Sequence, residues 1–357
     1  MQRCSQCGFP DTRPGLIFED STCLACINFA KRKEVDWGLR ALELKKICDK
    51  YRGSKPYDCL IPVSGGKDSH RLVHIMKEEM DMNPLLVTVS DSFTHTQAGL
   101  YNIRNLITRY NSNHWQYTIS HDLFIRATRA AFEGTGEPLS YVEFAIYTVP
   151  FMLAQKLEIG LLIFGENSAW EYGSEREDLS DAGNRHIASM VRKIEDKTGW
   201  WESKGISYKE LFSILPYRDQ FNFPQMIYMS HYRPWSSVVN LEVARANGFK
   251  TLSEIPEPDG VWKREGVFPD DDFEQIDSVA YLVHLWLKYP KFGFQRVTDI
   301  ATRRLREGRI TREECNRAIA EHDHKLDPNA LKDFCQTLGY SQDQFWEIVN
   351  KFKRSFK

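Results

Sequence analysis

Ser64-Gly65-Gly66-Lys67-Asp68-Ser69 follows an apolar run at 58–63 and opens a helical pattern. The apolar run predicts a buried strand, so the two glycines stand where a strand turns into a helix. Glycine lets the backbone approach an oxyanion closely, and a helix N-terminus directs unpaired N–H groups and a positive dipole end at it. The serine hydroxyls and the lysine ammonium add donors. This stretch therefore predicts an anion site, and its spacing is neither GxxxxGK(S/T) nor GxGxxG.

The sequence on both sides of this loop alternates between apolar strands and helical patterns. Strands are predicted at 58–63, 85–91, 114–119 and 160–165, and helices at 67–81, 95–110, 121–133 and 140–158. Such alternation predicts βαβ units and an α/β fold with a doubly wound, mostly parallel sheet. Ligands of these sheets bind outside the carboxyl ends of the strands. We therefore expect the site to combine the loop at 64–69 with residues 90–93 and 165–168.

The composition excludes some classes of protein. The 357 residues carry a formal net charge of −2, so the bulk charge does not indicate a nucleic-acid surface, and we expect no nucleic-acid partner. We expect no membrane span, because no apolar run is long enough, and the first residues do not resemble a secretory signal. These features favour a cytoplasmic protein with reduced cysteines.

Four of the eight cysteines fall within the first 26 residues, as two C-x2-C pairs separated by fifteen residues. Two such pairs typically converge on one tetrahedral zinc ion, so Cys4, Cys7, Cys23 and Cys26 are the predicted ligands. Four thiolates leave no open coordination position, so the Zn²⁺ should be structural. A disulfide pair and a redox pair are the competing interpretations. The other cysteines are Cys48, Cys59, Cys315 and Cys335, which we expect to be small buried residues.

The chain divides into four predicted regions. A zinc ribbon spans 1–30, a linker helix 31–56, the strand-and-helix domain 57–250, and a helical C-terminal subdomain 251–357. The polar stretch 167–225 is predicted to be an irregular functional lid. Capping boxes begin at Thr311 and Ser341, and Asp327 precedes a proline at the first position of another helix.

The SGGKDS loop resembles the PP-loop of the ATP pyrophosphatases, which cleave ATP to AMP and pyrophosphate. Together with the cysteine pairs and further motifs, the chain resembles the N-acetyl sugar amidotransferases, PP-loop proteins of bacterial surface-polysaccharide pathways, such as those of the lipopolysaccharide O-antigen and of nonulosonic acids. This narrower resemblance runs over most of the chain, and the motifs that carry it lie at 165–173, 228–237, 291–294, 298–301 and 308–314. The implied fold is that of the adenine nucleotide alpha hydrolases.

The resemblance implies a reaction with two steps. ATP and Mg²⁺ would adenylate the N-acetyl oxygen of a nucleotide-linked sugar, releasing pyrophosphate, and ammonia would then displace AMP to leave an acetamidino group. Adenylation converts a poor electrophile into a good one, while positioning and charge neutralisation supply the rate. The implied partners are a glutaminase that supplies ammonia and, in some pathways, a channel subunit resembling the cyclase of histidine biosynthesis.

The resemblance also implies roles for residues at the strand ends. The predicted ATP-binding residues are Ser64, Gly65, Gly66, Lys67, Asp68, Ser69, Asp91, Ser92 and Gly165. The predicted catalytic residues are Lys67, Asp68, Glu166 and Asn167. Asp68, Glu166 or Asn167 would hold Mg²⁺, but each also suits helix capping. Asp91 and Ser92 also suit plain turn chemistry.

The sugar site is predicted from the two aromatic motifs. Its proposed residues are Glu171, Tyr172, His231 and Arg233, although Tyr172 also suits packing and His231 suits an aromatic core. The acidic run 270–272 suits Mg²⁺ or a solvated loop, and 321–324 suits a structural helix end.

Two other functions remain open. PP-loop enzymes of tRNA thiolation share adenylation and similar zinc knuckles, but they generally need cysteines in or beside the PP-loop domain, and this chain has none from 60 to 314. A non-catalytic zinc-ribbon scaffold is the second alternative, and the intact loop disfavours it.

Overall fold

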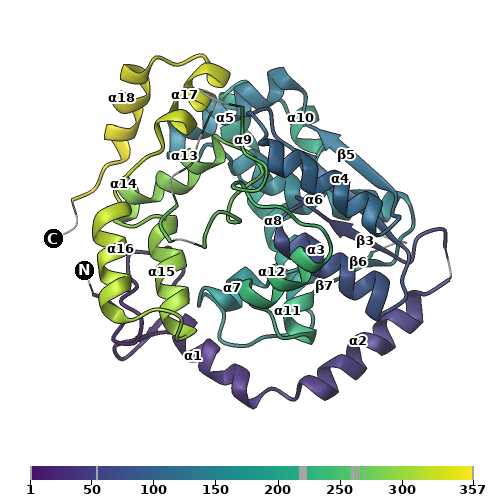
Figure 1. Cartoon of the computed structure of the whole chain (residues 1–357). Helices are drawn as coiled ribbons and strands as arrows, with labels where there is room; N and C mark the ends of the chain where they lie inside the picture. Colours follow the sequence, from purple (N-terminus) through teal and green to yellow (C-terminus); the bar gives the residue numbers. More distant parts are fainter. Residues whose placement is uncertain are drawn as a thin grey trace.

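The computed structural model describes residues 2–355, apart from 54, 217–222, 259–261, 263, 265 and 269. Its centre is a parallel five-stranded sheet in the order β5-β4-β3-β6-β7 (Figure 1). The strands are β3 (Cys59–Pro62), β4 (Pro84–Ser90), β5 (His114–Thr118), β6 (Leu161–Phe164) and β7 (Gln225–Tyr228). The first strand, β3, lies between β4 and β6, so the order of winding reverses beside it. The predicted doubly wound sheet is confirmed, and the SGGKDS loop follows the strand at this switch point.

Helices cover both faces of the sheet because successive side chains of a strand point to opposite sides. In β3, Cys59 and Ile61 pack in one core and Leu60 packs in another. The first core contains side chains of α2 (Trp37–Tyr51), α3 (Lys67–His74) and α4 (Gln97–Arg109), and the second contains side chains of α6 (Ser140–Lys156) and α8 (Ala182–Asp196). Helix α3 continues as a π-helical turn, η2 (Ile75–Glu79), and α12 (Ser237–Ala246) packs against α3.

The predicted irregular lid at 167–225 is wrong for the described part of that stretch. Its elements are α7 (Ser168–Glu171), α8, α9 (Thr198–Ser203), α10 (Tyr208–Phe212) and β7, and residues 217–222 lie outside the described residues. In α8 the buried isoleucines Ile187 and Ile194 stand seven positions apart among polar residues. This spacing places both isoleucines on one helix face. The surrounding residues are mostly polar, so the average composition of the stretch resembles that of a loop and hides the helical pattern.

The N-terminal segment forms a small ribbon followed by helices. Its elements are β1 (Phe18–Glu19), β2 (Thr22–Cys23), α1 (Leu24–Lys31) and η1 (Arg32–Glu34), with β1 antiparallel to β2. Helix α2, in purple along the lower edge of Figure 1, lies within the predicted linker helix and leads to the sheet.

The described part of the C-terminal region is mostly helical. It contains α13 (Tyr281–Trp286), α14 (Lys288–Phe292), α15 (Arg296–Arg306), α16 (Arg312–His322), α17 (Pro328–Leu338) and α18 (Gln342–Phe352). The predicted capping boxes at Thr311 and Ser341 are confirmed, as is the Asp327 cap. Phe334 and Phe345 pack against Phe132 of α5 (His121–Thr135), so these helices share a core with the sheet domain.

Two acidic stretches of this region have structural roles. Asp323 is buried and accepts hydrogen bonds from the backbone N–H groups of Gln295 and Thr298, which confirms the structural interpretation of 321–324. In the run 270–272, Asp270 pairs with Arg304 and Asp271 is buried and accepts backbone N–H groups. The solvated-loop interpretation of this run is therefore wrong for Asp271.

Within the described residues, no helix is both long enough and apolar enough to span a membrane.

Candidate active site

The SGGKDS loop turns tightly from β3 into α3. Gly65 has a φ of 85°, and a Cβ atom built on it would lie 2.8 Å from Ile103 Cγ1, so this position requires glycine. The hydroxyl groups brace the turn, because the Ser64 N–H donates to Ser69 Oγ (3.0 Å) and the Gly66 N–H donates to Ser64 Oγ (3.4 Å). The loop is thus preformed at the N-terminus of α3, as an oxyanion site requires.

Lys67 is the cation of the loop and is buried, with 8% of its side chain exposed. Its Nζ lies 3.1 Å from Asp68 Oδ2 and 3.6 Å from Glu274 Oε1. Burial alone would lower the pKa of Lys67, but the negative charges of Asp68 and Glu274 outweigh it and raise the pKa. The side chain therefore stays charged, as the neutralisation of a phosphate requires.

Asp68 lies in the first turn of α3 but does not cap the helix. Gly66 occupies the N-cap position without a side-chain cap. Asp68 Oδ1 instead accepts a hydrogen bond from Asn240 Nδ2 at 2.7 Å, and half of the side chain is exposed. The capping interpretation is wrong here, and the carboxylate is available to a metal ion or a ligand.

The end of β4 carries Asp91 and Ser92. Asp91 Oδ1 accepts from the Phe93 N–H at 2.9 Å and from Ser278 Oγ at 3.3 Å, which is turn chemistry. Burial raises the pKa of Asp91. Ser92 is half-buried beside it. Both residues lie where parallel strands end, on the same edge as the loop.

The end of β6 brings Gly165, Glu166 and Asn167 to that edge. A Cβ atom on Gly165 would lie 2.9 Å from Trp235 Cζ2, so glycine allows this indole to approach. Asn167 caps α7 by accepting from the Trp170 N–H (3.4 Å), whereas its Nδ2 atom is buried without a hydrogen-bond partner. Glu166 Oε1 accepts a hydrogen bond from Arg303 Nη2 of α15 at 3.1 Å.

A small cavity of about 20 Å³ lies between these strand ends and α15. Its polar lining includes Asp68 and Glu166, and carboxylate oxygens are the ligands that Mg²⁺ prefers. Aromatic rings of Trp170 and Trp235 line the same cavity. The remaining lining residues are Ala25, Asn28, Phe29, Arg32, Glu171, Ser236, Ser237, Arg303, Arg306 and Glu307. The cavity therefore joins metal-binding oxygens, aromatic faces and guanidinium groups.

Glu171 and Tyr172 also face this region. Glu171 pairs with Arg32, and burial raises the pKa of Glu171 to about 7. The Tyr172 hydroxyl oxygen accepts hydrogen bonds from Arg303 Nη2 (2.5 Å) and Arg296 Nη1 (3.3 Å). Both residues thus connect the end of β6 to cationic side chains.

His231 and Arg233 lie elsewhere, and neither is among the described lining residues of the cavity. His231 has 2% of its side chain exposed, contacts Arg40 of α2, and has Nδ1 2.9 Å from Asp178 Oδ2. Arg233 Nε lies 3.6 Å from Glu79 Oε2. The same motif instead reaches the cavity through Trp235, Ser236 and Ser237.

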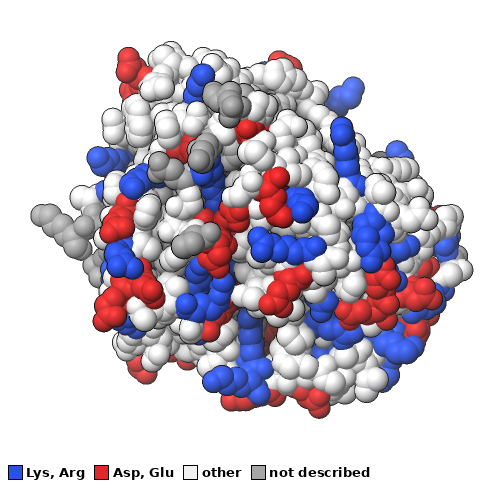
Figure 2. Space-filling view, viewed as in Figure 1, with Lys and Arg blue, Asp and Glu red and all other residues white. Residues whose placement is uncertain are grey.

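Arginines of α15 and Arg32 belong to the site but are absent from the sequence-based set. Arg296 and Arg303 stand seven positions apart in α15 and therefore lie on one helix face. The spacing gives their common helix face, but nothing in the sequence places that face against the strand ends. On the face shown in Figure 2, Lys and Arg side chains lie among Asp and Glu side chains rather than in a patch of one sign.

A larger cavity of about 490 Å³ adjoins α15 on another side. Its lining includes Arg264, Trp286 and Lys325. It shares Arg296 and Ile300 with a further cavity of about 10 Å³, which lies beside Glu274 and is separate from the cavity at the strand ends. The volume of the larger cavity lies within the usual range of small-molecule sites, about 300–1,000 Å³.

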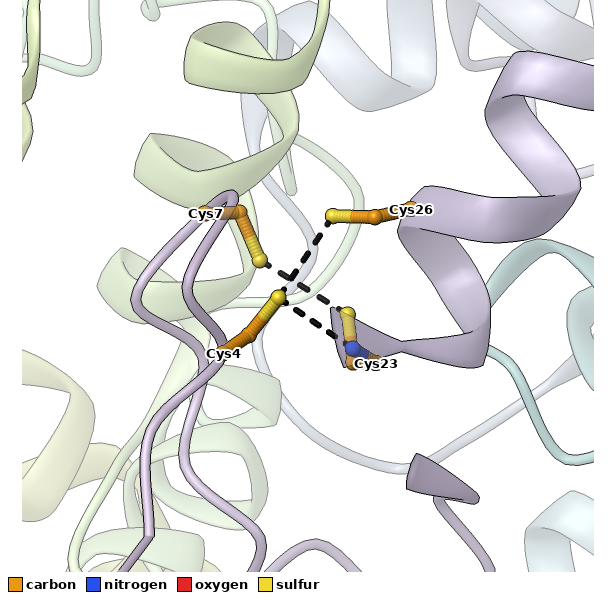
Figure 3. A group of neighbouring side chains, drawn as sticks. All are labelled: Cys4, Cys7, Cys23 and Cys26. Atoms are coloured by element: carbon orange, nitrogen blue, oxygen red, sulfur yellow. Dashed lines mark hydrogen bonds between the residues drawn. The ribbon is translucent and has the colours of Figure 1, made fainter. Parts of the chain in front are cut away.

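The four N-terminal cysteines meet in one buried cluster (Figure 3). Their sulfur atoms all lie within 4.8 Å of one another, with 3.8 Å between Cys4 and Cys26 and 3.7 Å between Cys7 and Cys23. Four sulfurs at about 2.3 Å from a tetrahedral zinc ion would be about 3.8 Å apart. The cluster fits zinc, and its closed set of four thiolates predicts a structural metal.

The ribbon that carries this cluster contacts both sides of the small cavity. Toward α15, Arg13 Nη1 lies 2.7 Å from Asp299 Oδ1, and Arg306 Nη1 lies 3.6 Å from Cys7 Sγ. Toward α7, Asn28 Nδ2 donates to the Trp170 carbonyl at 2.8 Å. The zinc ribbon therefore holds α15 in position opposite the strand ends.

Comparisons with known proteins add one family match. Residues 269–357, which include α15, match the family described as LPS biosynthesis protein WbpG-like, C-terminal domain. A search of curated proteins found no match.

Three solved structures are similar at low identity. U34-tRNA thiolase NcsA from Methanococcus maripaludis with its 4Fe-4S cluster is 13% identical over 92% of this chain and 89% of that chain, with a TM-score of 0.34. NMN synthetase from Francisella tularensis is 10% identical over 90% and 98%, with a TM-score of 0.36. NH3-dependent NAD synthetase from Campylobacter jejuni subsp. jejuni NCTC 11168, in complex with the nitrate ion, is 13% identical over 63% and 99%, with a TM-score of 0.31.

Proposed function

We propose that this protein is an ATP-dependent amidating enzyme of surface-polysaccharide synthesis. The match of residues 269–357 to the WbpG-like C-terminal domain of LPS biosynthesis proteins supports this function. Its substrate is a nucleotide-linked N-acetyl sugar, which it converts to the acetamidino form. The observation that carries the proposal is the position of α15. Arg303 and Arg306 of this helix line the small cavity together with Asp68 of the SGGKDS loop, so the WbpG-like segment and the loop meet at one cavity, which supports the proposal.

In the first step the acetamide oxygen attacks the α-phosphorus of ATP. A new P–O bond forms, and the bond between the α-phosphorus and the oxygen that bridges it to the β-phosphorus breaks. Pyrophosphate leaves with the electron pair of that bond. The loop N–H groups at the start of α3 bind the departing phosphates, and Lys67 neutralises their charge. Asp68 and Glu166 are the residues that would hold Mg²⁺, which supplies further charge neutralisation when bound.

In the second step ammonia attacks the activated carbon, and AMP leaves with the electrons of the C–O bond. Loss of protons from the added nitrogen gives the neutral amidine. All eight cysteines are buried and four of them form the zinc cluster, which leaves no exposed thiol for glutamine hydrolysis. Ammonia therefore comes from a separate glutaminase, in some pathways through a channel subunit, and the reaction takes place in the cytoplasm, where ATP and nucleotide sugars occur.

Arg32 and Arg306 line the small cavity and suit the phosphates of the sugar's carrier. Trp170 and Trp235 are 5% and 8% exposed, so they shape the cavity rather than offer an open face to a sugar ring. The 490 Å³ cavity beside Arg296 has room for a nucleoside. Thiolation of tRNA is disfavoured because no cysteine is among the described residues that line these cavities.

The test incubates purified protein with ATP, Mg²⁺, ammonium and a panel of nucleotide-linked N-acetyl sugars. We expect AMP formation that depends on one sugar, and a product in which NH replaces oxygen by mass spectrometry. AMP formation that requires tRNA and ignores every sugar would overturn the proposal.

A further inference from the structure

The Glu274 side chain lies where cationic side chains of the loop and of α15 meet. Its Oε1 lies 3.6 Å from Lys67 Nζ, and its Oε2 accepts a hydrogen bond from Arg296 Nη2 at 3.2 Å. A second cavity of about 10 Å³, distinct from the one at the strand ends, is lined by Glu274, Arg296 and Arg303. Only 7% of the Glu274 side chain is exposed, so water screens these charges little. A carboxylate of the chain itself thus fills a position that is built for an anion.

The protonation state of Glu274 agrees with this description. Burial alone would raise the pKa of Glu274, but the charges of Lys67, Arg296 and Arg303 lower it to about 2. The carboxylate is therefore fully ionised near neutral pH. Without this negative charge, the cations would be left buried and uncompensated, which makes them strong receptors for another anion.

Glu274 does not use all the donors around it. Arg296 Nε is buried and has no hydrogen-bond partner. A carboxylate has two oxygens, both engaged here, whereas pyrophosphate offers more acceptor oxygens and more charge. A diphosphate in this position can therefore engage donors that the carboxylate leaves unpaired.

The backbone around Glu274 is anchored on both sides. The Leu252 N–H donates to the Asp272 carbonyl at 3.1 Å, and the Thr96 N–H donates to the Asp277 carbonyl at 3.1 Å. The backbone of this segment is therefore held in place, and an exchange of anions would fall on the Glu274 side chain.

We propose that Lys67, Arg296 and Arg303 together bind the pyrophosphate that leaves ATP. Glu274 occupies this position until ATP enters, and then its side chain turns away. This inference rests on the proposed function, because pyrophosphate is the product of adenylation. It assigns two arginines of the WbpG-like segment to phosphate binding and makes Glu274 a competitor built into the chain.

The test measures binding of inorganic pyrophosphate by isothermal titration calorimetry. We expect Glu274→Gln to bind pyrophosphate about tenfold more tightly than the wild type, because the amide keeps the shape and removes the competing charge. Arg296→Gln should bind about tenfold more weakly. If Glu274 only stabilises the fold, its replacement leaves the affinity unchanged or weakens it, and that result overturns the inference.

Glu137→Gln is the matched control, since Glu137 pairs with Lys291 and neither residue lines the cavity beside Glu274. It should leave pyrophosphate affinity unchanged. If Glu274→Gln does not fold, Glu274→Asp takes its place, because the shorter carboxylate withdraws from Lys67 and should tighten binding by a smaller factor. Pyrophosphate binding needs neither sugar nor ammonia. If the wild type binds pyrophosphate but the Glu274 variants bind it no more tightly, only this inference is overturned. If no sugar supports AMP formation, the proposed function is overturned.

Discussion

The two walls of the small cavity are built in different ways. The wall at the strand ends contains Asp68 and Glu166, and the loop that carries Asp68 is shaped by its backbone, with a positive φ at Gly65, a helix N-terminus and hydroxyls that brace the turn. The wall at α15 is made by long cationic side chains whose positions depend on ion pairs and on the zinc ribbon. The first wall is therefore set by local sequence, and the second by contacts between segments far apart in the chain.

The largest expected difference between the two walls follows removal of zinc, which should destabilise the wall at α15 and not the wall at the strand ends. Structural zinc sites contribute on the order of 10 kcal/mol to the folding of their segments, so chelation should release the ribbon and its hold on α15. We expect hydrogen exchange to show α15 amides losing protection by about 100-fold or more, while β3 and α3 keep theirs.

A uniform loss of protection across β3 and α15 would contradict this separation. The same chelator, saturated with zinc before it is added, is the control and should leave the protection of α15 unchanged.

Lys67→Ala tests the wall at the strand ends. Removing one charge that stabilises developing phosphate charge typically lowers kcat by about 10²- to 10³-fold. Zinc content and the melting temperature should stay close to the wild type. Sugar-dependent AMP formation measures the effect, and Lys45→Ala, on the exposed face of α2, is the control. Unaltered turnover in Lys67→Ala would remove Lys67 from the mechanism.

Gly65→Ala tests the backbone geometry directly. A side chain at a φ of 85° costs about 1–2 kcal/mol, and the contact with Ile103 adds to this cost, so we expect a loss of about 2–3 kcal/mol in the free energy of unfolding. Gly205 has a φ of 79° with no heavy atom within 4 Å of an added Cβ. Urea denaturation of Gly205→Ala should show only the smaller, conformational cost, and equal losses at both positions would contradict the predicted clash.

The smallest expected effect, counted per pH unit, is the pH dependence of stability caused by Glu171. Its pKa is raised from 4.5 to about 7 by burial, so between these values the native state binds more protons than the unfolded chain. Stability should therefore fall as the pH rises from about 4.5 to 7, by at most about 1.4 kcal/mol per pH unit from this group. Urea denaturation at several pH values should show that Glu171→Gln removes this slope, and an unchanged slope would contradict the assignment.

The wall at the strand ends could be predicted from the sequence because its signals are local. Strand, glycines and helix follow one another at 58–81, and each has a direct effect on the backbone. The cysteine spacing is likewise local, and the four sulfur atoms converge as predicted. The wall at α15 could not be predicted, since nothing near Arg303 in the sequence indicates Glu166 as its partner. The motif at 228–237 was likewise not predictable in detail. Its sequence does not indicate that Trp235 lines the cavity whereas His231 contacts Arg40 of α2.

The contact between the ribbon and α14 has a consequence for the order in which the protein matures. Thr12 donates a hydrogen bond to the Phe292 carbonyl, 280 residues further along the chain. At about 5–20 residues per second, a ribosome needs roughly 15 to 55 s to make the intervening chain. The ribbon must therefore wait for the helical region that follows the sheet domain, and the nascent chain has the SGGKDS loop well before it has a closed cavity. Synthesis of α14 and α15 is then the event that completes the cavity beside the loop.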